Sequence, residues 1–213
     1  MKKQIKNYTT LIFCLSLLIF INSCSGTFSV DISSPDSTNQ LREKIGKEIN
    51  GDDMVVEIRL ASASETFSSD MKMATVNYYE AGKKEPLAKI VDLGGGDPRT
   101  SRPDPYAFDQ DDDTNTIRAT GVKFSDIDFS KIHTNIAKAI AIMESDEVGM
   151  PYSGIGDYTI KVPYPDKISH TFTLQSSGGT STKTGNRGLT LETKYYEIKF
   201  EADKDGNVTL KKK

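Results

Sequence analysis

The chain has no tryptophan, and only two cysteines and two histidines among its 213 residues. Cys14 and Cys24 both lie near its start, so the long remainder carries no thiol. Disulfides, cysteine zinc sites and thiol catalysis are therefore excluded from that remainder, which must be stabilised by core packing. Acidic residues outnumber basic ones and the net charge is −3. This balance argues against sequence-independent nucleic-acid binding, which needs clustered lysine and arginine.

The first residues have the anatomy of a secretory leader. Lys2, Lys3 and Lys6 precede an apolar run over residues 11–21, which is too short to span a bilayer as a helix. The run ends in Ile21-Asn22-Ser23-Cys24, which resembles the lipobox of bacterial lipoproteins. The resemblance implies cleavage before Cys24, a lipid on its sulfur, and, with Ser25 following, an outer-membrane location facing the periplasm or the cell surface. A plain signal peptide followed by a chance cysteine is the alternative.

Composition divides the chain into four parts. We expect a signal peptide over residues 1–23, then the lipidated cysteine and a polar tether over 24–36. A first folded unit is expected over 37–124, including an acidic loop rich in glycine and proline at 94–115, and a second unit over 125–213. Cleavage would leave 190 residues with a net charge of −6.

A helix followed by strands is predicted in the first unit. Ser37 and Gln40 have the spacing of a capping box, and apolar residues recur every four positions until Asn50-Gly51. Runs rich in apolar and β-branched residues then predict strands over 54–61, 71–79, 87–93 and part of 116–124.

The second unit repeats this order. Residues 129–143 carry the strongest helical periodicity, with Ser125 or Asp128 as the N-cap. Strands are predicted over 157–162, 168–175, 189–201 and 207–211, and Lys204-Asp205-Gly206-Asn207 predicts a tight hairpin between the last two. The polar residues 176–188 are interpreted as a long flexible hairpin loop.

These elements predict an α+β protein made of two units, each a helix plus a four-stranded antiparallel meander (α-β4), arranged in tandem or fused into one sheet. The order of elements, together with the closing hairpin over residues 195–208, resembles the PepSY-type and β-lactamase-inhibitor-type modules of bacterial envelopes. A single sheet with both helices on one face is equally compatible with the pattern.

Catalytic and metal signals are few. His133 and His170 stand in no recognisable motif, and no Gly-x-Ser-x-Gly elbow occurs. Asp109, Asp111 and Asp113 could offer oxygen ligands to calcium, but the glycine and distal glutamate of a calcium loop are missing. We expect no catalytic residue and no cofactor.

The resulting hypothesis is a non-catalytic envelope lipoprotein, joined to the membrane through Cys24, that binds an unknown protein or ligand and no nucleic acid. Adjacent strand residues point to opposite faces, so one ring of each tyrosine pair is expected to face outward. The candidate binding residues are Tyr79, Tyr195, Thr180 and Lys183. The alternatives are an envelope hydrolase with a carboxylate site and a calcium-dependent adhesion module.

Overall fold

A computed structural model describes residues 29–62, 67–109, 117–146, 148–185 and 188–211, and for residues 180–193 it describes the backbone alone. The elements follow one another in this order: β1 (Val30–Asp31), α2 (Ser37–Gly46), β2 (Met54–Ala61), β3 (Asp70–Met71), β4 (Met73–Tyr79), β5 (Leu87–Asp92), β6 (Arg99–Ser101), β7 (Val122–Lys123), the 3-10 turn η1 (Phe124–Asp126), α3 (Ser130–Glu144), β8 (Gly154–Tyr164), β9 (Lys167–Gly185), β10 (Gly188–Asp203) and β11 (Val208–Leu210).

One large antiparallel sheet dominates the fold. Its strands lie in the order β11-β10-β9-β8-β2-β4-β5-β6, and β7 pairs with the start of β2. The central pair joins β2 to β8, so the sheet runs without a break across the boundary expected near residue 125. β1 and β3 form a small separate ladder. The predicted α+β class is therefore confirmed, and all described strands other than β1 and β3 belong to one sheet.

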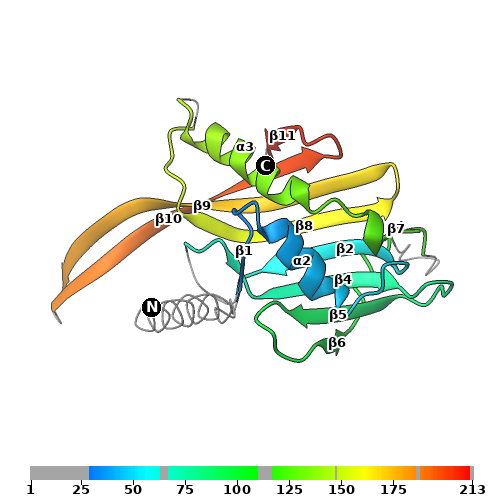
Figure 1. The fold of residues 1–213 in the computed structure, drawn as a ribbon. Helices are drawn as coiled ribbons and strands as arrows, with labels where there is room; N and C mark the ends of the chain where they lie inside the picture. The colour runs from blue at the N-terminus through cyan, green and yellow to red at the C-terminus, as the bar shows by residue number, and fades with distance from the viewer. Residues whose placement is uncertain (1–28, 63–66, 110–116, 147, 186–187, 212–213) are drawn as a thin grey trace, which may run out of the picture.

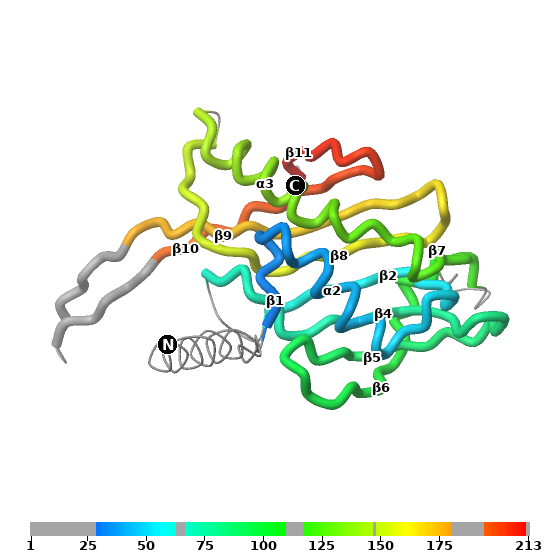
Figure 2. The backbone as a smooth tube through the Cα atoms, in the orientation of Figure 1, coloured from blue at the N-terminus to red at the C-terminus, as the bar shows by residue number. Residues whose placement is uncertain are grey.

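Both helices cover the same face of this sheet (Figures 1 and 2). Leu41 and Ile45 of α2 and Ile132 and Ile136 of α3 belong to one buried cluster with the strands. Across β8, β9 and β10 the rings of Tyr158, Phe172 and Phe200 are stacked, with centroids 5.0 and 5.7 Å apart. This continuous apolar layer holds the two halves of the sheet together.

The ends of the helices differ in part from prediction. The capping box at Ser37 is wrong, because Ser37 lies inside α2 and its buried hydroxyl has no hydrogen-bond partner among the described residues. α2 also ends at Gly46, before the predicted Asn50. The N-cap of α3 is Phe129, one residue after the predicted Asp128, whose carboxylate still accepts hydrogen bonds from the backbone N–H and hydroxyl of Ser130. Those bonds lower the pKa of Asp128, with the hydroxyl bond contributing most.

Three segments are more ordered than their composition predicted. The expected loop over 176–188 is mostly strand, because β9 and β10 continue to Gly185 and Gly188. β6 lies inside the expected loop 94–115, whereas the predicted strand near 116–124 is reduced to β7. The folded part also begins before residue 37, since Val30 and Ile32 are fully buried.

Neither α2 nor α3 is long and apolar enough to cross a bilayer, and the same holds for every helix in the described part of the chain.

Candidate functional site

Among the described residues, a second buried apolar cluster lies on the face of the sheet opposite the helices, over its first half (β2, β4, β5 and β6). We call residues 102–109 and 117–121 the covering segment. Tyr78 belongs to the helix-side core, whereas the adjacent Tyr79 packs with Phe108 and Val56 in a second buried cluster, so the two rings lie on opposite faces. The Tyr79 and Phe108 rings meet edge to face with centroids 5.1 Å apart. The phenol of Tyr79 donates a hydrogen bond to the carbonyl of Ala119 at 2.9 Å.

A network of ion pairs around one buried carboxylate fixes the covering segment to the sheet. The Glu57 side chain has no solvent exposure, and its carboxylate lies 2.7 Å from Arg59 Nε and 3.7 Å from Lys161 Nζ. Arg59 also reaches Asp104 Oδ2 at 2.5 Å. Asn77 donates to Glu57 and accepts from the backbone N–H of Asp104. The negative charge of the buried Glu57 carboxylate is therefore compensated by two cations, Arg59 and Lys161, and by a hydrogen bond from Asn77.

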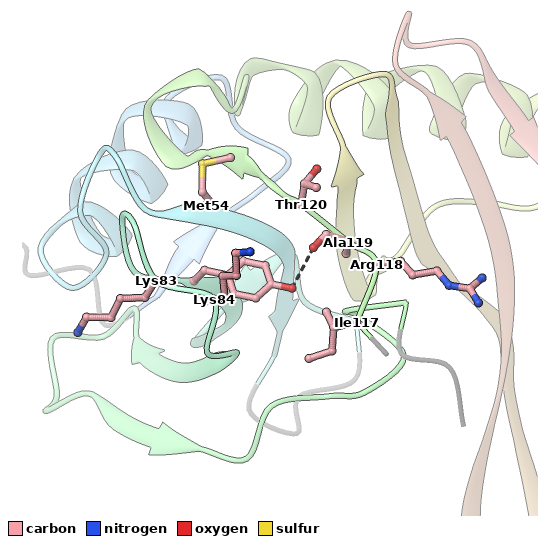
Figure 3. A pocket seen from close by; sticks show the side chains of 8 residues that line it. Met54, Lys83, Lys84, Ile117, Arg118, Ala119 and Thr120 are labelled. Atoms are coloured by element: carbon pink, nitrogen blue, oxygen red, sulfur yellow. Dashed lines mark hydrogen bonds between the residues drawn. The ribbon is translucent and has the colours of Figure 1, made fainter. Parts of the chain in front are cut away.

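A hollow of about 490 Å³ opens beside the covering segment (Figure 3). The β4–β5 turn forms one wall with two lysines, and residues 117–120 form the other. The floor comes from the first residue of β2 and the last residue of β4. The lining residues are Met54, Tyr79, Lys83, Lys84, Ile117, Arg118, Ala119 and Thr120. Half-buried apolar side chains therefore meet cationic ones in one concavity, as in many ligand pockets.

A glycine sets the position of the second wall. Gly121 has φ +73, and a Cβ there would lie 2.8 Å from the Val55 carbonyl oxygen. The backbone N–H groups of Thr120 and Gly121 both donate to the carbonyl of Pro163, at 2.9 and 3.0 Å. A larger residue at 121 would combine a disfavoured φ with a clash against β2, so this close approach requires glycine.

The lysines of the pocket are not equivalent. Lys83 is ion-paired with Glu80, whose hydrogen bond raises the Lys83 pKa. Lys84 makes no ion pair or hydrogen bond with another residue of the described ranges. In Figure 3 Lys83 and Arg118 extend outward in opposite directions, while Lys84 lies nearer the middle. Burial raises the pKa of the Tyr79 phenol, with a smaller contribution from Tyr164. The pocket therefore presents a neutral ring and an available ammonium group.

The second half of the sheet carries a long two-stranded arm. β9 is paired with β8 only as far as Gln175, and beyond that residue it is paired with β10 alone, up to Gly185 opposite Gly188. The arm projects away from the body of the sheet (Figure 1). Gly178 and Gly179 form a bulge where it leaves the sheet, because both lie between the pairs Tyr195–Ser177 and Thr193–Thr180.

The base of the arm exposes two tyrosines. Tyr195 is 56% exposed and Tyr196 is 47% exposed. The ring of Tyr195 meets Phe67 edge to face at 6.4 Å, and a Cβ on Gly178 would lie 2.6 Å from the ring of Tyr196. Solvent-exposed tyrosines on a strand that has one unpaired edge are typical of interaction surfaces.

The structure separates the residues selected from the sequence. Tyr195 lies at the base of the arm, and Thr180 and Lys183 lie along it opposite Thr193 and Thr190. Tyr79 is 6% exposed and lines the pocket instead of facing outward as expected. Both rings of the Tyr78–Tyr79 pair are buried because the covering segment lies on the second face.

The remaining candidates from the sequence are Cys24 and the aspartates Asp109, Asp111 and Asp113. Cys24, Asp111 and Asp113 lie outside the described residues. The Asp109 carboxylate accepts a hydrogen bond from the Tyr164 hydroxyl. In the described ranges no group of three or more metal-ligating side chains comes together.

His170 belongs to a buried polar network on the helix side of the sheet. Its Nδ1 lies 3.0 Å from the Tyr158 hydroxyl, which accepts a hydrogen bond from Asn135 Nδ2 at 3.2 Å. Burial, assisted by Lys131, lowers the pKa of His170 to about 4. Nearly complete burial in the core layer indicates a structural role.

Sequence reasoning missed the residues that form the covering segment or hold it to the sheet. Glu57 and Arg59 lie in the strand 54–61, which was predicted from its apolar residues alone. Their spacing of two residues places opposite charges on one face of the strand, and this could have indicated an ion pair. Phe108 was assigned to a loop, and Ile117 to a predicted strand over part of 116–124. Their apolar character in an acidic, polar stretch was the one signal that this stretch covers something.

Comparison of the chain with protein-family models, with curated proteins and with solved structures found no match.

Proposed function

We propose that the protein is a non-catalytic, lipid-anchored binding protein of the cell envelope. Its pocket would take a small ligand that has an apolar body and one acidic group. The observation that carries this proposal is the hollow in which Met54 and Ile117 lie beside Lys84. The leader and Cys24 support the envelope location and the anchor.

The chemistry of the lining suggests the ligand class. Apolar surface from the floor and the 117–120 wall favours a hydrophobic body. A carboxylate, sulfonate or phosphate on that body could pair with the ammonium group of Lys84, which has no partner in the described part of the chain.

The two alternatives have less support. A hydrolase would be favoured by paired carboxyl groups with raised pKa values, but the three described carboxyl groups whose pKa is shifted, Asp52, Asp128 and Asp203, are all lowered. A calcium-adhesion role has one described residue, Asp109, which is hydrogen-bonded to Tyr164. Calorimetric titration with calcium that gives no heat would remove that role.

We also propose that the fold is two α-β4 units fused side by side. The order α2-β2-β4-β5-β6 is repeated as α3-β8-β9-β10-β11, and each series is a meander in the sheet. The first strand of each unit pairs antiparallel with the first strand of the other, β2 with β8. This arrangement supports the resemblance to PepSY-type and β-lactamase-inhibitor-type modules at the level of architecture alone.

The pocket can be tested with 1-anilinonaphthalene-8-sulfonate, an aromatic sulfonate whose fluorescence rises in apolar surroundings. The native protein should bind it saturably. Lys84→Glu should weaken binding about five-fold, because the substitution replaces a charge that attracts the sulfonate with one that repels it. Lys204→Glu, a charge reversal at an exposed lysine of the β10–β11 turn, is the matched control. Equal binding by both variants would refute the role of Lys84.

The anchor has its own test. Cells labelled with radioactive palmitate should yield labelled protein, and Cys24→Ala should remove the label and release the protein from membranes. Label retained by Cys24→Ala would show that the lipid is attached elsewhere.

A further inference from the structure

Neither edge of the arm has a described strand beside it: the β9 edge beyond Gln175 is broken by the bulge at Gly178 and Gly179, whereas the β10 edge is regular. β10 pairs with β9 along one edge, and on the other edge β11 pairs only with residues 200–202. The backbone N–H of Lys211 also donates to the Lys199 carbonyl at 2.8 Å. Residues 188–198 of β10 therefore present a row of backbone donors and acceptors that no other described strand uses, over about 35 Å.

This edge lacks most of the features that protect sheet edges. Natural edge strands are blunted by proline, bulges, short length or charged side chains. Of these features, residues 188–198 have the charged side chains Glu192, Lys194 and Glu197. Residues 188–198 contain no proline, and the bulge at the base of the arm lies in β9, at Gly178 and Gly179. An isolated two-stranded ribbon is also only marginally stable in water. A third strand along this edge would stabilise the ribbon and satisfy its backbone.

The sequence of the edge is compatible with pairing to itself. Two copies of one strand that pair antiparallel are related by a two-fold axis perpendicular to the sheet, so one residue lies opposite its own copy. The register that overlaps all of residues 188–198 places Thr193 on that axis. Glu192 then lies opposite Lys194 of the second copy, and Leu191 opposite Tyr195. No like charges face each other in this register.

We propose that two copies of this chain pair through β10, antiparallel and centred on Thr193, so that the two arms form one four-stranded ribbon. We choose a second copy as the partner because one register meets two conditions. It overlaps the whole free edge, residues 188–198, and it places Glu192 of each copy opposite Lys194 of the other. Tyr195 and Tyr196 would become part of the interface between the copies. This interaction does not depend on the pocket, which lies in the other half of the sheet.

Cysteine cross-linking tests the register. In a full-length chain with Cys14→Ser and Cys24→Ser, the introduced thiol is the only one. Directly opposed residues in an antiparallel pair have Cα atoms about 4.5–5.5 Å apart, within reach of a disulfide. Thr193→Cys should form a dimer on mild oxidation. Thr182→Cys, on β9 at the same level of the arm, should not. No dimer at 193, or equal dimer at 182, would overturn the proposal.

A charge exchange tests the same interface without oxidation. Glu192→Lys or Lys194→Glu alone places like charges opposite each other twice in each dimer, and each should weaken dimerisation about ten-fold in sedimentation equilibrium. The double exchange of both residues restores opposite charges and should restore dimerisation. Single variants that dimerise normally, or a double variant as weak as either single one, would contradict the register.

Discussion

The two halves of the sheet have the same order of elements but treat their helix-free face in opposite ways. In the first half, Phe108 of the covering segment packs on Tyr79 and Val56. Ion pairs around the buried Glu57 carboxylate hold this segment to the sheet. In the second half the described contacts over that face are those of Phe67 with Gln175 and Tyr195 at the base of the arm, and β9 and β10 extend beyond them. The first half thus gains a pocket and the second half gains an exposed edge.

The difference teaches that the shared architecture supplies the core, while the connections supply the surfaces for binding. The helix-side layer runs through both halves and includes Tyr158, Phe172 and Phe200. The pocket, in contrast, depends on the β6–β7 connection and on the turn between β4 and β5. Stability should therefore be concentrated on the helix side, and the helix-free side should open locally.

The largest expected effect comes from comparing one phenylalanine in each layer. Phe172→Ala should lower the free energy of unfolding by about 3–5 kcal/mol, because it removes the middle ring of the stack. Phe108→Ala should cost about 1–2 kcal/mol, because the covering segment can open without unfolding the sheet. Urea denaturation measures both. Equal losses would show that the covering segment is as central as the core.

Acid should weaken the helix-side core through His170. Its pKa is about 4 in the folded protein and 6.5 in the unfolded chain, so protonation favours unfolding. The contribution of His170 to stability is fully present above pH 6.5 and is lost as the pH falls from 6.5 to about 4, amounting to about 3 kcal/mol. His170→Gln should flatten this part of the stability–pH curve, whereas His133→Gln should not. A curve unchanged by His170→Gln would contradict this assignment.

The ion pairs of the buried Glu57 carboxylate with the half-exposed Arg59 and Lys161 should contribute less to the free energy of unfolding than His170 does. Glu57→Gln keeps the side chain's shape and its acceptor for Asn77 but removes the charge between Arg59 and Lys161, and we expect a loss of about 2 kcal/mol. Glu43→Gln, in an exposed pair with Lys47, should change stability by less than about 0.5 kcal/mol. Thermal unfolding of both variants makes the comparison, and a Glu57→Gln effect as small as the control would place that carboxylate in water.

The smallest effect on stability should come from the pocket floor. Tyr79→Phe removes the hydrogen bond to the Ala119 carbonyl, at a cost of about 1 kcal/mol. Because that bond joins the floor to the second wall, amide hydrogen exchange of residues 117–120 should accelerate while exchange in β9 stays the same. Unchanged exchange at 117–120 would mean that the wall is held without Tyr79.

The sequence predicted those elements that depend on neighbouring residues, and it missed those that depend on contacts between distant parts of the chain. β2 occupies the predicted residues 54–61, and the Asp203 carboxylate anchors the predicted hairpin through the backbone N–H of Asn207. The arm was read as a loop because serine, threonine and glycine favour turns, whereas backbone pairing between β9 and β10 overrides that preference. Phe108 and Glu57 were not recognised because their partners come from distant parts of the chain.

The most direct test of this account is methyl NMR of the native protein during titration with 1-anilinonaphthalene-8-sulfonate. The account predicts saturable shifts for the methyl groups of Met54 and Ile117, which line the pocket, and none for Ile198 or Leu210 in the second half. Shifts confined to Ile198 and Leu210, or equal shifts in both halves, would contradict a binding site beside the covering segment.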